Sequence, residues 1–108
     1  MPFASASIGK SFRNEISPRQ GLLRVREFTM AEIEHYVHPD RKQHPRFKEV
    51  QHIEMPLYSK GDQLKAAGSS KITIGQAVTS GMVNNETLGY FMARIYLFLV
   101  KVFFASFI

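Results

Sequence analysis

The chain has 108 residues, of which 44% are hydrophobic and 21% are charged, and its formal net charge is +5. This length suits a single domain, and the composition excludes an intrinsically disordered chain. The sequence contains no cysteine, which excludes disulfide frameworks, thiolate nucleophiles and cysteine-type zinc sites. The basic excess is compatible with a nucleic acid, a nucleotide or an anionic surface as partner, and it does not choose among them.

Two strands joined by a loop are predicted near the amino terminus. Residues 10–16 and 22–30 alternate in polarity, and the SPRQG stretch between them predicts a turn. An antiparallel hairpin is the simplest arrangement of two such strands. The FTMAEIEHY stretch also admits a helix, because Thr29 is followed three residues later by Glu32, as in a capping box. We favour a strand through Phe28, since valine, phenylalanine and threonine suit a pleated surface.

The remaining chain predicts a polar connector followed by helices. Residues 37–71 form the connector, with a short strand near Ile53–Tyr58 and a loop after it, and residues 72–108 form the helical segment. The stretch from Gly89 to Ile108 approaches the length of a membrane span, but it contains Arg94 and Lys101. Since two charges inside the bilayer are costly, we favour a buried helix. The predicted fold class is α+β, with residues 1–36 as its strand–loop–strand part.

Candidate site residues are concentrated in the two predicted strands. The histidines lie without metal-ligand spacing, and no glycine-rich phosphate loop occurs, so we predict no protein metal site and no such loop. Even spacing places Arg13 and Glu15 on one face of the first strand, and it places four residues on one face of the second, namely Arg24, Arg26, Phe28 and Glu32. Such a face suits phosphate, a stacked base and an ammonium group. A solvated arginine–glutamate ladder is the alternative, and the residue pattern alone slightly favours it.

A family resemblance covers these residues. The segment FRNEISPRQGLLRVREFTMAEIEHY closely resembles motif 2 of glycyl-tRNA synthetase (glycine–tRNA ligase), a class II aminoacyl-tRNA synthetase. The Phe-Arg-x-Glu strand, the loop and the Arg-x-Arg-Glu-Phe strand all match. The similarity extends to PFASASIGKSF, HPRFKEV and VNNETLGYFMARIYLFLVKV, so it covers roughly residues 2–102, and residues 103–108 depart from the pattern. The resemblance implies that the hairpin belongs to the antiparallel sheet of a class II catalytic domain.

The resemblance also implies roles for individual residues. Arg13 matches the arginine that clamps the α-phosphate and the reacting carboxylate, and it is the one implied catalytic residue. Glu15 matches the reader of the adenine amino group, Arg24 the arginine of the outer phosphates, and Phe28 the ring that stacks on adenine. Glu32 matches the carboxylate near the ammonium group of glycine. Further residues of the same binding segments are, for ATP, Asn14, Val25, Arg26 and Glu27, and, for glycine, Thr29.

The implied activity is ATP-dependent attachment of glycine to tRNA(Gly) through glycyl-adenylate, with Mg²⁺ accompanying ATP. The family implies a homodimer in the cytoplasm or in an organelle such as the mitochondrion, with no membrane partner. Because family members are several times longer, we expect the 108-residue chain alone to be a catalytically inert fragment. Two alternatives stay open at this point: a non-catalytic ATP-binding or interaction module, and a small basic membrane-associated protein anchored by its apolar last segment.

Overall fold

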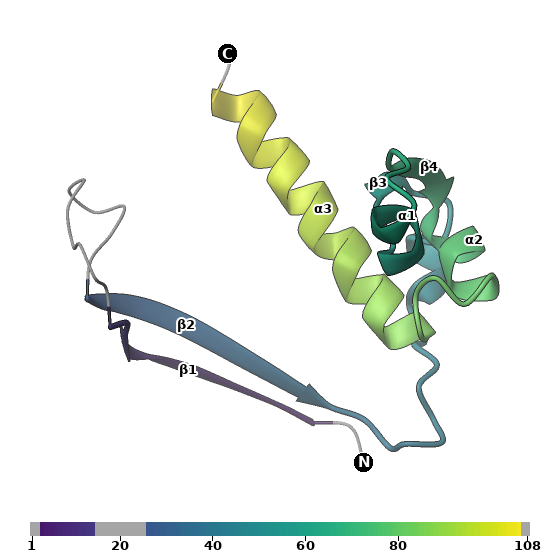
Figure 1. Ribbon diagram of the computed structural model, residues 1–108. Helices are drawn as coiled ribbons and strands as arrows, with labels where there is room; N and C mark the ends of the chain where they lie inside the picture. Colours follow the sequence, from purple (N-terminus) through teal and green to yellow (C-terminus); the bar gives the residue numbers. More distant parts are fainter. Residues whose placement is uncertain (1–2, 15–25, 107–108) are drawn as a thin grey trace. The chain divides into compact units, whose positions relative to one another are not determined.

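The computed structural model describes residues 3–14 and 26–106 of the chain (Figure 1). The chain divides into two compact units, residues 1–39 and residues 40–108. Each unit contains one two-stranded antiparallel sheet, and the second unit also contains the helices. The predicted α+β class is therefore confirmed.

The first unit is an antiparallel hairpin of β1 (Phe3–Phe12) and β2 (Glu27–Tyr36), which run side by side in Figure 1. The pairing register begins with Phe3 opposite Tyr36 and ends with Phe12 opposite Glu27. The antiparallel hairpin is confirmed, and the helical alternative for FTMAEIEHY is wrong. The strand predicted over residues 22–30 is present from Glu27 onward, and β1 ends at Phe12, whereas a strand was predicted over residues 10–16. Residues 15–25 of these two predicted strands and their loop lie outside the described residues. Pairing with β1 supplies the backbone hydrogen bonds of that stretch, so a local capping signal does not decide its conformation.

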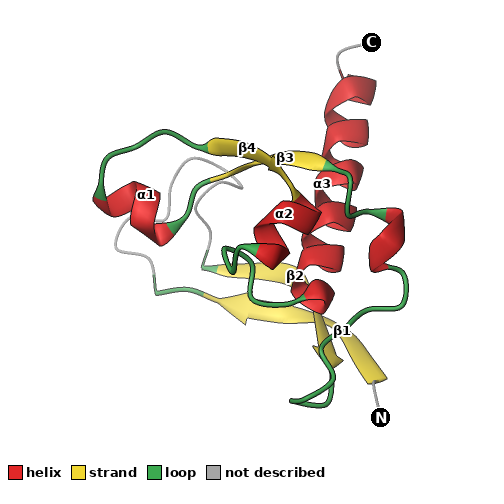
Figure 2. Ribbon diagram, turned by 90° about the vertical axis from the view of Figure 1, so that its right-hand side faces the viewer, coloured by secondary structure: helices red, strands yellow, loops and turns green. Residues whose placement is uncertain are grey.

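The second unit contains a small sheet surrounded by helices (Figure 2). Its elements in chain order are the 3₁₀ turn η2 (Phe47–Glu49), β3 (Glu54–Leu57), α1 (Lys60–Leu64), β4 (Ser70–Thr73), α2 (Ile74–Thr79) and α3 (Glu86–Ser106). Strand β3 pairs antiparallel with β4, from Glu54 opposite Thr73 to Leu57 opposite Ser70. The strand expected near Ile53–Tyr58 is thus present, and Pro56 is tolerated because a two-stranded sheet leaves each strand an open edge.

The segment predicted as a polar connector contains more regular structure than its composition indicates. Helix α1 lies where a loop was expected, and a capping box between Ser59 and Asp62 satisfies backbone groups at its amino end. Helix α2 begins with a second capping box, in which Thr73 and Gln76 exchange hydrogen bonds. These local side-chain bonds stabilise helices that are too short to persist by propensity alone.

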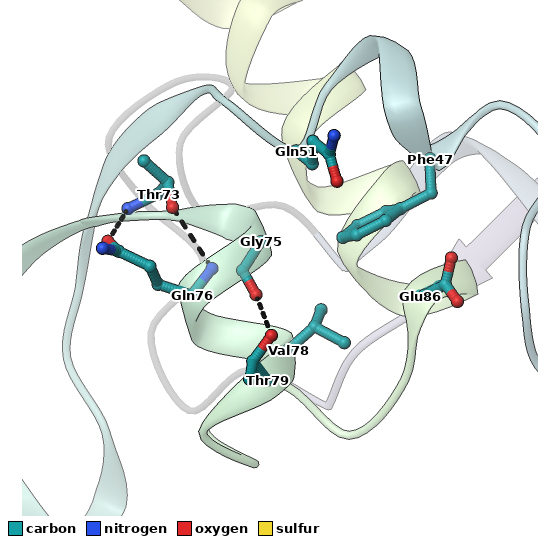
Figure 3. A pocket seen from close by; sticks show the side chains of 8 residues that line it. All are labelled: Phe47, Gln51, Thr73, Gly75, Gln76, Val78, Thr79 and Glu86. Carbon is teal, nitrogen blue, oxygen red and sulfur yellow. Dashed lines mark hydrogen bonds between the residues drawn. The ribbon is translucent and has the colours of Figure 1, made fainter.

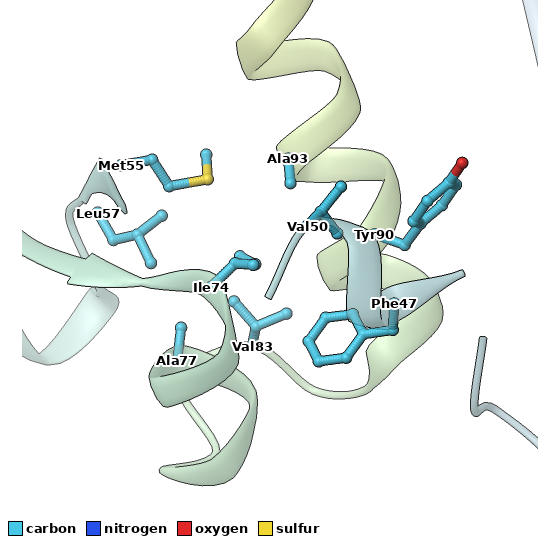
Figure 4. Packing of buried hydrophobic residues seen from close by; sticks show 9 residues of the cluster. All are labelled: Phe47, Val50, Met55, Leu57, Ile74, Ala77, Val83, Tyr90 and Ala93. Atoms are coloured by element: carbon cyan, nitrogen blue, oxygen red, sulfur yellow. The ribbon is translucent and has the colours of Figure 1, made fainter. Parts of the chain in front are cut away.

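The hydrophobic core of the second unit is built from nine buried residues (Figure 4): Phe47, Val50, Met55, Leu57, Ile74, Ala77, Val83, Tyr90 and Ala93. Two of them, Phe47 and Val50, come from the polar segment, where each is the apolar neighbour of charged residues. In β3 the buried Met55 and Leu57 alternate with exposed residues, as expected for a strand with one covered face. The core therefore draws on the connector as well as on the predicted helices.

Helix α3 packs closely against α2 through Gly89. A Cβ atom added at Gly89 would lie 2.9 Å from Val78 Cγ2 and 3.2 Å from Phe47 Cε2. The predicted buried helix is found for the first turns only, since Ile95, Phe98 and several later apolar side chains are exposed. Within the described residues, no helix is long and apolar enough to cross a membrane.

Candidate functional site

The register of the β1–β2 hairpin sorts the predicted site residues onto two faces. Because side chains alternate along a strand, directly paired residues lie on the same side of the sheet. We call one side of this sheet the arginine face. On β2 and the residue before it, this face consists of Arg26, Phe28, Met30, Glu32, Glu34 and Tyr36. On β1 and the residue after it, the face consists of Arg13, Ser11, Gly9, Ser7, Ser5 and Phe3. Four predicted site residues thus share one face: Arg13, Arg26, Phe28 and Glu32. The even spacing predicted this for the three residues of the second strand, and the register adds Arg13.

One end of the arginine face combines arginine guanidinium groups with an aromatic ring. The Arg13 backbone N–H donates to the Arg26 carbonyl oxygen at 2.8 Å, which extends the ladder one pair beyond β1. The Arg13 guanidinium carbon lies 5.9 Å from the centre of the Phe28 ring. Guanidinium groups bind phosphate oxygens in a bidentate manner, and the ring offers a surface for stacking a base. This end of the face has the chemistry that a nucleotide requires.

Glu32 lies farther along the same face. Its spacing of four residues from Phe28 corresponds to about 14 Å along an extended strand. Its direct partner on β1 is Ser7, while the next residue pair toward Phe28 is Met30 with Gly9. A Cβ atom added at Gly9 would meet no other atom within 4 Å, so the face above this part of β1 is open. The carboxylate of Glu32 is therefore accessible to an ammonium group.

The far end of the face contains an aromatic and acidic pair. The Tyr36 and Phe3 rings stack with centroids 4.7 Å apart, and the Tyr36 hydroxyl donates to the Glu34 carboxylate. This hydrogen bond is the main cause of a raised pKa of the Tyr36 phenol, and the charge of Glu32 adds to it.

Two other predicted residues lie on the opposite face. Thr29 pairs directly with Lys10, and the Lys10 ammonium lies 2.6 Å from the Glu27 carboxylate. Glu27 and Thr29 thus point away from the side that carries Arg13 and Phe28. The residue pattern alone does not single out Lys10, because its partner becomes evident only when the register is known.

Asn14 is exposed and directly follows Arg13. The other predicted site residues lie outside the described residues, namely Glu15, Arg24 and Val25. In the ranges 3–14 and 26–106, no three histidine or acidic side chains converge as metal ligands would.

An open pocket of about 560 Å³ occurs in the second unit (Figure 3), lined by Phe47, Gln51, Thr73, Gly75, Gln76, Val78, Thr79 and Glu86. Thr73 and Gln76 bond each other in the capping box, and the Thr79 hydroxyl donates to the Gly75 carbonyl oxygen at 2.9 Å. Much of the polar lining of the pocket is therefore already hydrogen-bonded within the protein. Among the residues that the structure describes, no predicted site residue lines this pocket.

Comparison with known proteins finds glycine–tRNA ligases. The chain is 63% identical over 106 residues to glycine–tRNA ligase 2 of Saccharomyces cerevisiae, an alignment that covers 94% of this chain and 17% of the relative. The chain is homologous to one segment of the glycine–tRNA ligases. It is also 62% identical to the mitochondrial glycine–tRNA ligase 1 of the same yeast and 53% identical to a putative cytoplasmic glycine–tRNA ligase of Arabidopsis thaliana, with 94% of this chain covered in both cases.

The chain spans only 15% and 22% of the length of those last two glycine–tRNA ligases. No protein-family model matches the chain. The similarity therefore covers most of this chain and leaves the other parts of a complete glycine–tRNA ligase outside the comparison.

Proposed function

We propose that this segment forms the ATP- and glycine-facing hairpin of a glycine–tRNA ligase. The observation that supports the proposal most directly is the shared face of Arg13, Phe28 and Glu32, within a chain 63% identical to a glycine–tRNA ligase. A solvated ladder would pair arginines with glutamates on this face. Instead, Arg13 lies over an aromatic ring, and the ion pair between Lys10 and Glu27, within the described part of the hairpin, lies on the other face.

In the proposed reaction, a carboxylate oxygen of glycine attacks the α-phosphorus of ATP. A new bond forms between the carboxylate oxygen and the α-phosphorus. The bond between the α-phosphorus and the oxygen that bridges to the β-phosphate breaks, and pyrophosphate leaves with the electron pair. The 3′-terminal hydroxyl of tRNA(Gly) then attacks the glycyl carbonyl carbon and displaces AMP. Positioning and charge neutralisation dominate such a reaction, because its transition state spreads negative charge over the phosphate oxygens.

Three residues of the arginine face have assigned tasks in this proposal. The Arg13 guanidinium binds the α-phosphate and orients the glycine carboxylate, while Phe28 stacks on adenine. Glu32 accepts hydrogen bonds from the ammonium group of glycine. Glu15 and Arg24 are proposed for the adenine amino group and the outer phosphates on the strength of the motif alone, since both lie outside the described residues.

Magnesium fits this arrangement as a companion of ATP. Mg²⁺ is bound largely by substrate phosphates and water rather than by all-protein cages. When bound, the ion would supply charge neutralisation at the phosphates, and the tasks of the arginine face do not depend on it.

We also propose that the 108-residue chain has no ligase activity alone. Arg13, Arg26 and Glu32 are exposed, so the described hairpin offers one wall to a ligand and does not exclude water. Measurement of glycine-dependent exchange of pyrophosphate into ATP tests this on the purified chain. We expect no exchange, and robust exchange would refute the inactivity.

A chimera tests the role of the segment. We would replace the corresponding segment of the yeast glycine–tRNA ligase 2 with this chain and measure pyrophosphate exchange and tRNA charging. We expect the chimera to be active and the Arg13→Ala chimera to lose at least about a hundredfold in kcat/KM, as for loss of a transition-state donor. The matched control is Arg41→Ala, which removes an exposed arginine outside the hairpin. Equal activity of Arg13→Ala and Arg41→Ala would reject the proposed role of Arg13.

The remaining assignments extend the same proposal. We propose tRNA(Gly) as the nucleic-acid partner and a homodimer as the state of the complete ligase. The named relatives include a mitochondrial and a cytoplasmic ligase, and we propose the cytoplasm for the ligase that contains this segment. Binding of ATP to the chain without activity of the chimera would favour the non-catalytic ATP-binding module instead.

A further inference from the structure

The sequence of β1 specifies its pairing register only weakly. Between Phe3 and Phe12 it consists of small residues apart from Ile8 and Lys10, and both faces of the hairpin are largely exposed. Strands of this kind can slip along their partner, because no buried apolar set penalises a different alignment. A shift by two residues even keeps every side chain on its original face. It would nevertheless move Arg13 past Phe28 by about 7 Å.

Two contacts distinguish the observed register from its neighbours. On the arginine face, Phe3 stacks on its direct partner Tyr36, with 22° between the ring planes. On the other face, Lys10 forms its ion pair diagonally with Glu27, since Lys10 pairs directly with Thr29. The two contacts lie near opposite ends of the paired strands, so together they act on the whole length of the hairpin.

Each shifted register loses at least one of these contacts. A shift by one residue places Lys10 and Glu27 on opposite faces and separates the two rings as well. A shift by two in one direction places Lys10 opposite Ala31, out of reach of Glu27. A shift by two in the other direction keeps the ion pair but places Phe3 opposite Glu34 instead of Tyr36. Only the observed register contains both contacts.

We propose that Lys10 and Glu27 are positioning residues, which set the register that brings Arg13 beside Phe28. This inference rests on the proposed function, because it gives the register a task in nucleotide binding. It also changes the role of Glu27, which the family motif assigns to the ATP-binding segment. Glu27 acts through Lys10 from the opposite face of the sheet, and it does not touch the nucleotide.

Disulfide trapping tests the register without any ligand. The chain has no cysteine of its own, so any disulfide that forms must join the two introduced cysteines. Ala6 pairs directly with Ile33, and alternation from the hydrogen-bonded Arg13–Arg26 pair makes this a closely spaced, non-hydrogen-bonded position. The Ala6→Cys/Ile33→Cys chain reports the observed register. The Ile8→Cys/Ile33→Cys chain reports the register in which Lys10 lies opposite Ala31.

In the unaltered background we expect mainly the Ala6–Ile33 cross-link. Lys10→Glu places like charges near each other, so the ratio of shifted to observed cross-link should rise about two- to fivefold. The Lys10→Glu/Glu27→Lys double variant restores the ion pair and should return the ratio to its original value. Lys101→Glu is the matched control, because it makes the same charge change at an exposed residue outside the hairpin, and it should leave the ratio unchanged.

Three results would overturn the inference: no Ala6–Ile33 cross-link in the unaltered background, a ratio insensitive to Lys10→Glu, or no restoration by the double variant. None of these measurements contains ATP, glycine or tRNA. A catalytically dead chimera with an intact cross-linking response would therefore count against the proposed function alone. An active chimera with an unresponsive ratio would count against the positioning role alone.

Discussion

Substitution of Gly89 by alanine tests how the core of the second unit is packed. Two effects of opposite sign compete at this residue. Alanine is favoured over glycine inside a helix by about 1 kcal/mol, because glycine loses more backbone entropy on folding. The added methyl group, however, meets Val78 Cγ2 at 2.9 Å, Phe47 Cε2 at 3.2 Å and Ile74 Cγ1 at 3.4 Å.

The packing effect should win. Phe47 and Ile74 are themselves buried in the core, so two of the three neighbours have little space into which they can move. Overpacking of this kind typically costs about 1–3 kcal/mol. After the helix-propensity gain is subtracted, we expect Gly89→Ala to lower the free energy of unfolding by about 1 kcal/mol.

Urea denaturation followed by far-ultraviolet circular dichroism measures this difference, since α3 contributes much of the helical signal. The matched control is Gly61→Ala in α1, where an added Cβ atom lies at an ordinary 3.6 Å from Ser59 Oγ. We expect that variant to be neutral or slightly stabilised.

A double-mutant cycle isolates the contact with Val78. Val78→Ala removes the nearest atom, so Gly89→Ala should be less destabilising in the Val78→Ala background by at least about 0.5 kcal/mol. If Gly89→Ala behaves like Gly61→Ala, or if the two core substitutions are simply additive, the inferred close packing of α2 against α3 is incorrect.

Three further predictions concern individual contacts. Hydrogen bonds from the Ser59 hydroxyl and the Ser59 backbone N–H hold the pKa of Asp62 below its ordinary value. The capping box should therefore stabilise α1 fully above the pKa of an unfolded aspartate, and this stabilisation should be lost as the pH falls through the lower pKa of the folded state. An NMR titration in which Ser59→Ala leaves the Asp62 pKa unchanged would contradict this. The hydrogen bond to the Glu34 carboxylate raises the pKa of Tyr36. This contact is therefore fully present below the pKa of an unfolded tyrosine, and it is lost as the pH rises through the pKa of the folded state. Glu34→Gln should lower the Tyr36 pKa in an NMR titration, and an unchanged value would exclude the contact. Ile74→Ala should cost about 2–5 kcal/mol in urea denaturation, because Ile74 is 0% exposed, and a loss below 1 kcal/mol would mean that the site is not enclosed.

The strand period was enough to predict the main feature of the site. Residues at even spacing share a face of any strand, so Arg26, Phe28 and Glu32 were grouped correctly before the pairing was known. The same pattern could not place Lys10 beside Glu27, because these residues are brought together by the register of two strands. Register depends on non-local contacts and on the loop, and local alternation does not encode it.

The second unit was predicted less well, for a related reason. The pattern near Ile53–Tyr58 indicated a strand, but its partner β4 follows α1 in the chain. Residues 70–71 of β4 were expected to belong to a loop and residues 72–73 to a helix. Phe47 and Val50 were counted within a polar connector, yet both are buried, because two apolar residues among charges form no periodic signal. The last segment was predicted as a buried helix, and its later turns expose Phe98 and other apolar residues.

By itself, the sequence determined the α+β class, the hairpin and the shared face of Arg26, Phe28 and Glu32, because composition and a period of two residues are local properties of the chain. Only the tertiary structure decided that Arg13 lies beside Phe28, that Glu27 bonds Lys10 on the far face, and that Gly89 brings α3 against α2. Each of these three contacts joins segments that are distant in sequence. Strand pairing and burial offset the chain entropy lost on closing the intervening loop, and no local sequence pattern contains that information.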